Sequence, residues 1–102
     1  MDILRPQDAA AEFLNFVLTH DQKPIAWSNW YVGISGNPVE RLKVHRAIEG
    51  QYSVVGVESG TVARAIEKFF IEFYHMDGHP CGGDDPRFVY VFKKRPDTDP
   101  PL

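Results

Sequence analysis

A tyrosine, an arginine and a histidine occur close together in the segment 30–45. The aromatic and β-branched residues around Tyr31 predict a strand, and the polar turn after it ends at Asn37, which can cap a following helix. Arg41 and His45 are one helical turn apart and would share a face of that helix. A phenol, a guanidinium and an imidazole can bind a phosphate and transfer a proton. The spacing allows these three groups to converge on one side of a strand-turn-helix unit.

The same segment resembles the second half of the GIY-YIG nuclease signature. In that family a Tyr-[Ile/Val]-Gly strand is followed, after a short polar turn, by an arginine on the next helix. Tyr31-Val32-Gly33 is similar to the strand motif, Arg41 follows the glycine at the family spacing, and His45 continues the match. The resemblance implies that Tyr31, Arg41 and His45 are catalytic. In either case we expect Val39, Leu42 and Val44 to face inward from this helix. The alternative to the catalytic role is a half-buried strand followed by an ordinary amphipathic helix with solvated charges.

A second similar segment follows a valine-rich strand expected over residues 52–58. Ser59 or Thr61 can cap a helix expected over 62–75. In the family, this helix carries an alanine followed by the metal-binding glutamate, and the resemblance implies that role for Glu67. The alternative is a glutamate that faces solvent, but Glu67 borders a wide apolar arc whose breadth predicts deep burial against the sheet. The arc consists of Val62, Ile66, Phe69, Phe70 and Phe73.

The first strand of the family signature is missing from its usual place, because residues 24–29 contain neither glycine nor tyrosine. Residues 87–94 form the clearest strand pattern in the chain, with Phe88, Tyr90 and Phe92 on one face and valines on the other. We expect one of two arrangements. Either this is a final strand with a core aromatic face, or the first family strand has been permuted to the C-terminus. The permutation would make Tyr90 a further catalytic residue beside Tyr31.

Two other segments have less specific patterns. Residues 8–19 predict an amphipathic helix, capped by Asp8, that covers one face of the sheet. Residues 76–86 predict a loop rich in glycine and proline. His75, His79 and Cys81 could contribute to a metal site there, and the alternative is a flexible loop beside the cleft.

Composition limits the class of protein. The chain has 102 residues, enough for one domain, and its single cysteine excludes an internal disulfide and favours the cytoplasm. No apolar run approaches the roughly 20 residues of a membrane-spanning helix. The formal net charge of −3 argues against a large, unselective nucleic-acid surface but allows local basic faces at 41–46 and 93–95.

We therefore expect an α+β fold: one domain over residues 1–94, with a small, mainly antiparallel three-stranded sheet, three flanking helices and a disordered tail at 95–102. The resemblance implies an endonuclease that cleaves nucleic acid, DNA ahead of RNA, with one Mg²⁺ or Mn²⁺ bound at Glu67. The alternatives are a catalytically inactive binding or regulatory module of the same fold, and an unrelated α+β protein.

Overall fold

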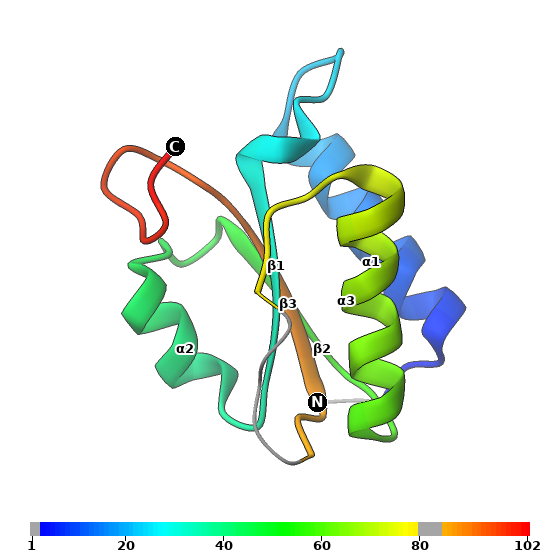
Figure 1. The fold of residues 1–102 in the computed structure, drawn as a ribbon. Helices are drawn as coiled ribbons and strands as arrows, with labels where there is room; N and C mark the ends of the chain where they lie inside the picture. The colour runs from blue at the N-terminus through cyan, green and yellow to red at the C-terminus, as the bar shows by residue number, and fades with distance from the viewer. Residues whose placement is uncertain (1–2, 80–84) are drawn as a thin grey trace.

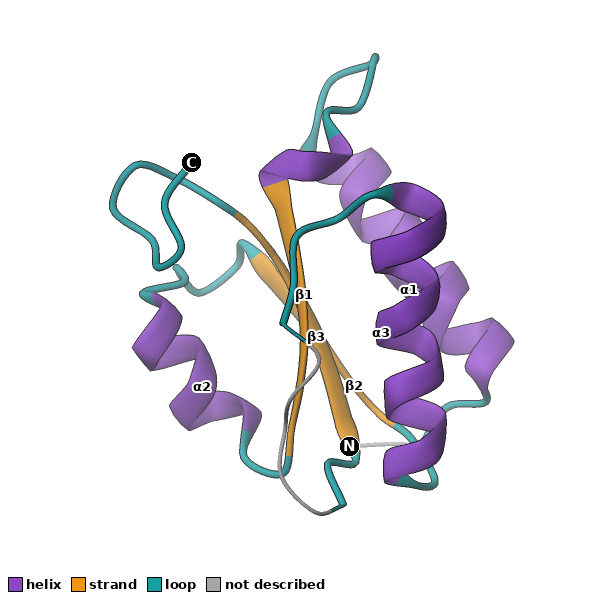
Figure 2. Cartoon of the chain, viewed as in Figure 1, coloured by secondary structure: helices purple, strands orange, loops and turns teal. Residues whose placement is uncertain are grey.

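The computed structural model describes residues 3–79 and 85–102 and has the expected α+β architecture. Three helices surround one three-stranded antiparallel sheet, which confirms the predicted class (Figures 1 and 2). In chain order the elements are α1 (Pro6–His20), the short 3₁₀ helix η1 (Trp27–Asn29), β1 (Trp30–Ser35), α2 (Pro38–His45), β2 (Tyr52–Gly56), α3 (Gly60–Tyr74) and β3 (Phe88–Lys93).

The last strand in the chain is the central strand of the sheet. The strand order is β1-β3-β2, and β3 pairs antiparallel with both neighbours. Tyr90 in the middle of β3 is opposite Gly33 of β1 on one side and Val54 of β2 on the other. The C-terminal strand therefore places Tyr90 one strand away from Tyr31.

The two faces of the sheet carry different cores, because successive side chains of a strand point to opposite faces. Val89 and Val91 of β3 join the larger core under α1 and α3, whereas Tyr90 and Phe92 join a smaller aromatic core under α2. The ribbon shows α1 and α3 on one side of the sheet and α2 on the other (Figure 1). The expected role of the first helix, covering one face of the sheet, is confirmed.

Local signals account for most helix starts. Asn37 caps α2 by accepting from the backbone N–H of Glu40, and Ser59 caps α3 by accepting from Val62. Asp8 is not a cap, and that prediction is wrong. Helix α1 begins at Pro6 without a side-chain cap, since the fixed φ of a proline already suits the first helical turn.

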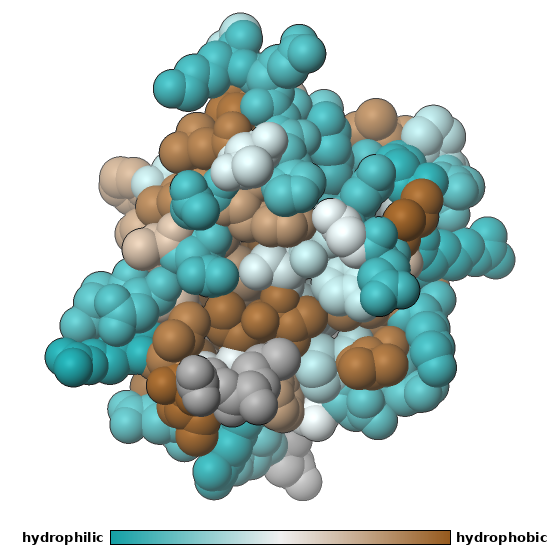
Figure 3. Space-filling view, turned by 180° about the vertical axis from the view of Figure 1, so that it is seen from behind, coloured by the Kyte–Doolittle hydropathy of each residue, from teal (hydrophilic) through white to brown (hydrophobic). Residues whose placement is uncertain are grey.

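Burial on two helices differs from the apolar pattern. On α2, Leu42 is buried, but Val39 and Val44 are exposed, because this short helix contacts the sheet along a narrow stripe. On α3, Ile66 and Phe70 are buried, whereas Phe69 and Phe73 are 42% and 69% exposed because they lie beyond the side that faces α1 and the sheet. Seen from behind, the hydrophobic residues form patches separated by hydrophilic ones (Figure 3).

The C-terminal segment 95–102 is not a free tail in the structure. It folds into a hydrogen-bonded turn around Thr98 and packs against the end of α2. Proline and aspartate content suggested disorder, but the hydrogen bonds of one buried hydroxyl hold this segment together.

No helix in the described ranges has the length and apolar character required to cross a bilayer.

Gly33 has no room for a side chain. A Cβ built on Gly33 would lie 2.4 Å from the Tyr90 ring, while one on Gly36 would meet nothing within 4 Å. We expect Gly33→Ala to lower the free energy of unfolding by about 1–3 kcal/mol in urea denaturation, because the Tyr90 ring must move. Gly36→Ala is the control, expected to change stability by less than about 0.5 kcal/mol. Equal effects of the two substitutions would contradict the close contact.

Candidate functional site

Tyr31, His45 and Tyr90 meet on the α2 face of the sheet. The ring centroids of Tyr31 and His45 are 4.7 Å apart, and those of Tyr31 and Tyr90 are 6.5 Å apart. Nε2 of His45 lies 2.8 Å from the Tyr90 hydroxyl. All three side chains are between 1 and 5% exposed. The structure therefore brings together three of the five residues expected in the site, including the one contributed by the C-terminal strand.

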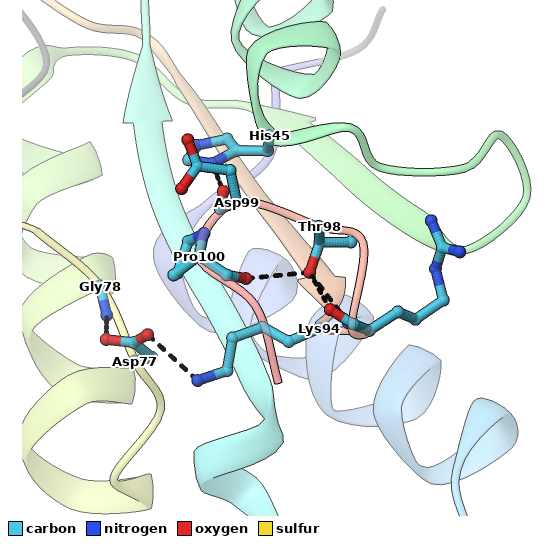
Figure 4. A network of polar contacts seen from close by, with 8 residues as sticks. His45, Asp77, Gly78, Lys94, Thr98, Asp99 and Pro100 are labelled. Carbon is cyan, nitrogen blue, oxygen red and sulfur yellow. Dashed lines mark hydrogen bonds and ion pairs between the residues drawn. The ribbon is translucent and has the colours of Figure 1, made fainter.

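The C-terminal turn determines the protonation pattern of His45. Its Nδ1 lies 2.5 Å from the backbone carbonyl of Asp99, and a carbonyl can only accept, so Nδ1 donates (Figure 4). Burial lowers the pKa of His45, which favours the neutral ring. In a neutral imidazole with a proton on Nδ1, Nε2 is the acceptor for the Tyr90 hydroxyl.

The two tyrosines differ in their hydrogen bonds. Burial raises the pKa of Tyr31 to about 12, with Tyr90 adding to the shift, and a hydrogen bond from the His79 backbone opposes it. Tyr31 is therefore a neutral phenol at ordinary pH and a poor base. Tyr90 has a neutral imidazole nitrogen at its hydroxyl, so it is better placed to pass on a proton.

Arg41 lies at the solvent side of this cluster. Its side chain is exposed, and its charge acts to lower the pKa values of both Tyr31 and His45. It forms no ion pair with another residue in the described ranges, whereas Lys43 on the same helix pairs with Glu40. Arg41 is thus an exposed cation near the tyrosine–histidine cluster.

Glu67 lies in a different place. It belongs to α3, which packs on the opposite face of the sheet, and it is only 1% exposed. Its Oε2 has no hydrogen-bond partner among the described residues, and burial raises its pKa to about 7 against an opposing effect of Arg64. It lines a recess of about 320 Å³ with Arg64, Lys68, Ile71, Glu72 and Gly78. None of Tyr31, Arg41, His45 and Tyr90 lines this recess.

One short segment connects the two places. Asp77 pairs with the edge of β1, accepting from Val32 N–H through its carbonyl and donating to the Trp30 carbonyl. Gly78, which follows, lines the Glu67 recess, and the ring of His79 is 6.4 Å from that of Tyr31. Both places therefore lie along the β1 edge of the sheet.

Two contributors to the site were not predicted from the sequence. The sequence indicated His79 only as a metal donor, and it contained no signal for the Asp99 carbonyl, which is a backbone group.

Asp77 lies between the predicted metal donors His75 and His79, and its carboxylate already has two partners. The Asp77 carboxylate accepts from Lys94 at 3.1 Å and from the Gly78 backbone at 2.9 Å (Figure 4). No group of three His, Cys, Asp or Glu side chains suited to a metal occurs in the described part of the chain, and Cys81 lies outside the described residues. Glu67 fits as a single carboxylate ligand, since one of its oxygens is buried without a partner among residues 3–79 and 85–102, and Mg²⁺ accepts one carboxylate with waters.

Comparisons with family models, curated proteins and solved structures give no match to this chain.

The Glu67 carboxyl should make stability depend on pH. Its pKa is about 7 in the folded protein against an ordinary value of 4.5, so the folded state binds more protons between these values. Its contribution to stability is complete below pH 4.5 and is lost as the pH rises through 7. We expect Glu67→Gln to raise the free energy of unfolding above pH 7 by about 1–3 kcal/mol in urea titrations and to flatten this slope. Glu72→Gln, an exposed position on the same helix, is the matched control. An unchanged slope in Glu67→Gln would contradict the assignment.

Proposed function

We propose that this chain is a divergent GIY-YIG-like endonuclease that cleaves nucleic-acid phosphodiester bonds with one divalent metal ion. The observation that carries the proposal is the position of Tyr90, which lies beside Tyr31 on the same face of the sheet and bonds His45. This position supports a permuted arrangement in which the C-terminal strand replaces the missing first strand. DNA is the favoured substrate, with RNA as the alternative.

Arg41 would bind the phosphate. It is exposed and free of ion pairs among the described residues, and its planar guanidinium matches two phosphate oxygens. Its position next to the tyrosine–histidine cluster would hold the phosphorus near a group that accepts a proton. Positioning of this kind accounts for much of the catalysis of phosphate chemistry.

Tyr90 and His45 would carry the proton of the attacking water. As the water oxygen attacks phosphorus, one of its protons passes to the Tyr90 oxygen while the Tyr90 proton moves to Nε2 of His45. The bond between phosphorus and the leaving oxygen breaks, and that oxygen takes a proton from solvent. A neutral His45 is required, and its lowered pKa supplies it. Tyr31 would orient the cluster rather than act as the base, because its pKa is about 12.

Glu67 would hold the divalent ion, with waters as the remaining ligands. An ion held there would supply positive charge for a phosphate. To meet both this ion and Arg41, the substrate would have to span the edge of β1, along which the Glu67 recess and the tyrosine–histidine cluster both lie. Oε2 is buried and has no hydrogen-bond partner in the part of the chain that the structure describes, which supports this role, since a cation satisfies a buried carboxylate that has no protein donor.

The second candidate is a catalytically inactive module of the same fold. The near-complete burial of Tyr31, His45 and Tyr90 favours it, because a substrate must reach the proton-accepting group. In such a module the aromatic cluster would be a structural core, and exposed Arg41 would contribute to a binding surface.

A cleavage assay on mixed DNA and RNA substrates with Mg²⁺ or Mn²⁺ distinguishes the candidates. We expect Arg41→Ala to reduce cleavage by about 100-fold or more, because a free phosphate ligand is lost, and Tyr90→Phe to do the same by removing the proton path. Arg5→Ala removes a cation at the start of α1 on the other face and should leave cleavage unchanged. This mechanism would be excluded if the Arg41→Ala protein still showed metal-dependent cleavage, or if pure wild-type protein showed no cleavage.

Metal binding has a readout that does not need activity. At pH 8 we expect 5 mM Mg²⁺ to raise the melting temperature of the wild-type protein by a few degrees, because an ion that binds only the folded state stabilises it. Glu67→Gln should lose this shift, while Glu12→Gln, at an exposed position of α1 that does not line the recess, should keep it. A shift of equal size in all three proteins would place the ion elsewhere.

A further inference from the structure

The C-terminal turn is organised by the Thr98 side chain, which is 4% exposed. Its hydroxyl oxygen accepts from the Arg95 backbone N–H at 2.9 Å and lies within donating distance of the carbonyls of Arg95 and Pro100 (Figure 4). The Thr98 backbone N–H also bonds the Arg95 carbonyl. One buried hydroxyl therefore closes the turn that carries Asp99.

Both backbone groups of Asp99 bind His45. The Asp99 N–H donates to the His45 carbonyl at 2.9 Å, and the Asp99 carbonyl accepts from Nδ1 of the same residue. The end of α2 is held a second time where the Arg95 guanidinium donates to the Arg46 carbonyl at 3.2 Å. This arrangement attaches the turn to the backbone and to the ring of His45 together, so the ring cannot rotate without opening the turn.

We propose that residues 95–102 are a positioning strap that holds His45 in the tautomer protonated at Nδ1 and thereby keeps Nε2 free to accept the Tyr90 proton. Thr98 and the Asp99 carbonyl are positioning groups in this scheme, since they act on His45 and do not touch a substrate. The tautomer follows from hydrogen bonds alone, and only its consequence for cleavage rests on the proposed function.

Tyr90 is a competing explanation for the tautomer, because its hydroxyl is the partner of Nε2. The Asp99 carbonyl can only accept a hydrogen bond, so it requires a proton on Nδ1. The Tyr90 phenol can either donate or accept, so it is compatible with Nε2 in either protonation state. The strap should therefore dictate the proton position on His45, and Tyr90 should follow it. Removing the Tyr90 hydroxyl separates the two explanations.

The test measures the ¹⁵N chemical shifts of the His45 ring in the full chain at pH 8, where the neutral ring dominates. We expect wild-type protein and Tyr90→Phe to show one tautomer, with the proton on Nδ1. Thr98→Val removes the hydroxyl at similar volume and should yield a mixture of tautomers, and Thr98→Ser should restore the single tautomer. Asp99→Ala keeps the carbonyl and should match the wild type.

Three results would overturn the strap: a proton on Nε2 in the wild-type protein, a mixture of tautomers in Tyr90→Phe, or a single tautomer protonated at Nδ1 in folded Thr98→Val. If Thr98→Val fails to fold, wild-type protein, Tyr90→Phe and Asp99→Ala still decide the question. Cleavage should fall about tenfold or more in Thr98→Val and recover in Thr98→Ser. If the tautomers are as predicted but the wild-type protein does not cleave nucleic acid, the strap is supported and the nuclease proposal is excluded.

Discussion

The sheet depends on β3, because this strand alone forms hydrogen bonds with both of the others. It is also the last strand in the chain, so every strand pair joins segments that are distant in sequence. The alternating side chains of β3 enter both cores, and a single strand thereby couples the α1–α3 layer to the α2 layer. The ring of Tyr90, in the middle of β3, lies so close to the neighbouring Gly33 of β1 that a side chain at position 33 would collide with it.

The buried polar groups follow two different patterns. Tyr90, His45 and the Asp99 carbonyl form a continuous chain in which each donor has an acceptor, and such a chain is compatible with a tightly packed interior. Glu67 is the opposite case, since one carboxylate oxygen is buried without a partner among the described residues. Its raised pKa expresses that cost, and a proton or a cation relieves it. The hydrogen-bonded chain fixes the positions of Tyr90 and His45, whereas the buried Glu67 oxygen is where a proton or a cation would bind.

The edge of β1 relates these two patterns to one proposed function. Asp77, Gly78 and His79 run along that edge, so one face of the segment meets the Glu67 recess while its end meets Tyr31. Arg41 adds an exposed cation on the α2 side. A phosphodiester held by Arg41 would lie at the rim of the aromatic cluster, and this geometry makes proton transfer through Tyr90 and His45 the chemistry we propose. The same burial that orders the cluster limits access to it, which is why the inactive module remains the second candidate.

Sequence patterns alone predicted the helices, the strands, a cap at Asn37, a cap at Ser59 or Thr61 and the position of Glu67 beside the apolar arc of its helix, because these depend on neighbours within a turn or on the alternation of one strand. They also placed Tyr90 and Phe92 on one face. The strand order, the exposure of Val39 and Phe73, the separate recess of Glu67 and the turn over His45 were decided only by the tertiary structure. Each of these features depends on which residues from distant parts of the chain pack against a given side chain. A periodic pattern shows that a residue is apolar, but it does not show what packs against that residue. The hydrogen bond from His45 to Asp99 is the clearest case, since its acceptor is a backbone carbonyl that any residue would supply.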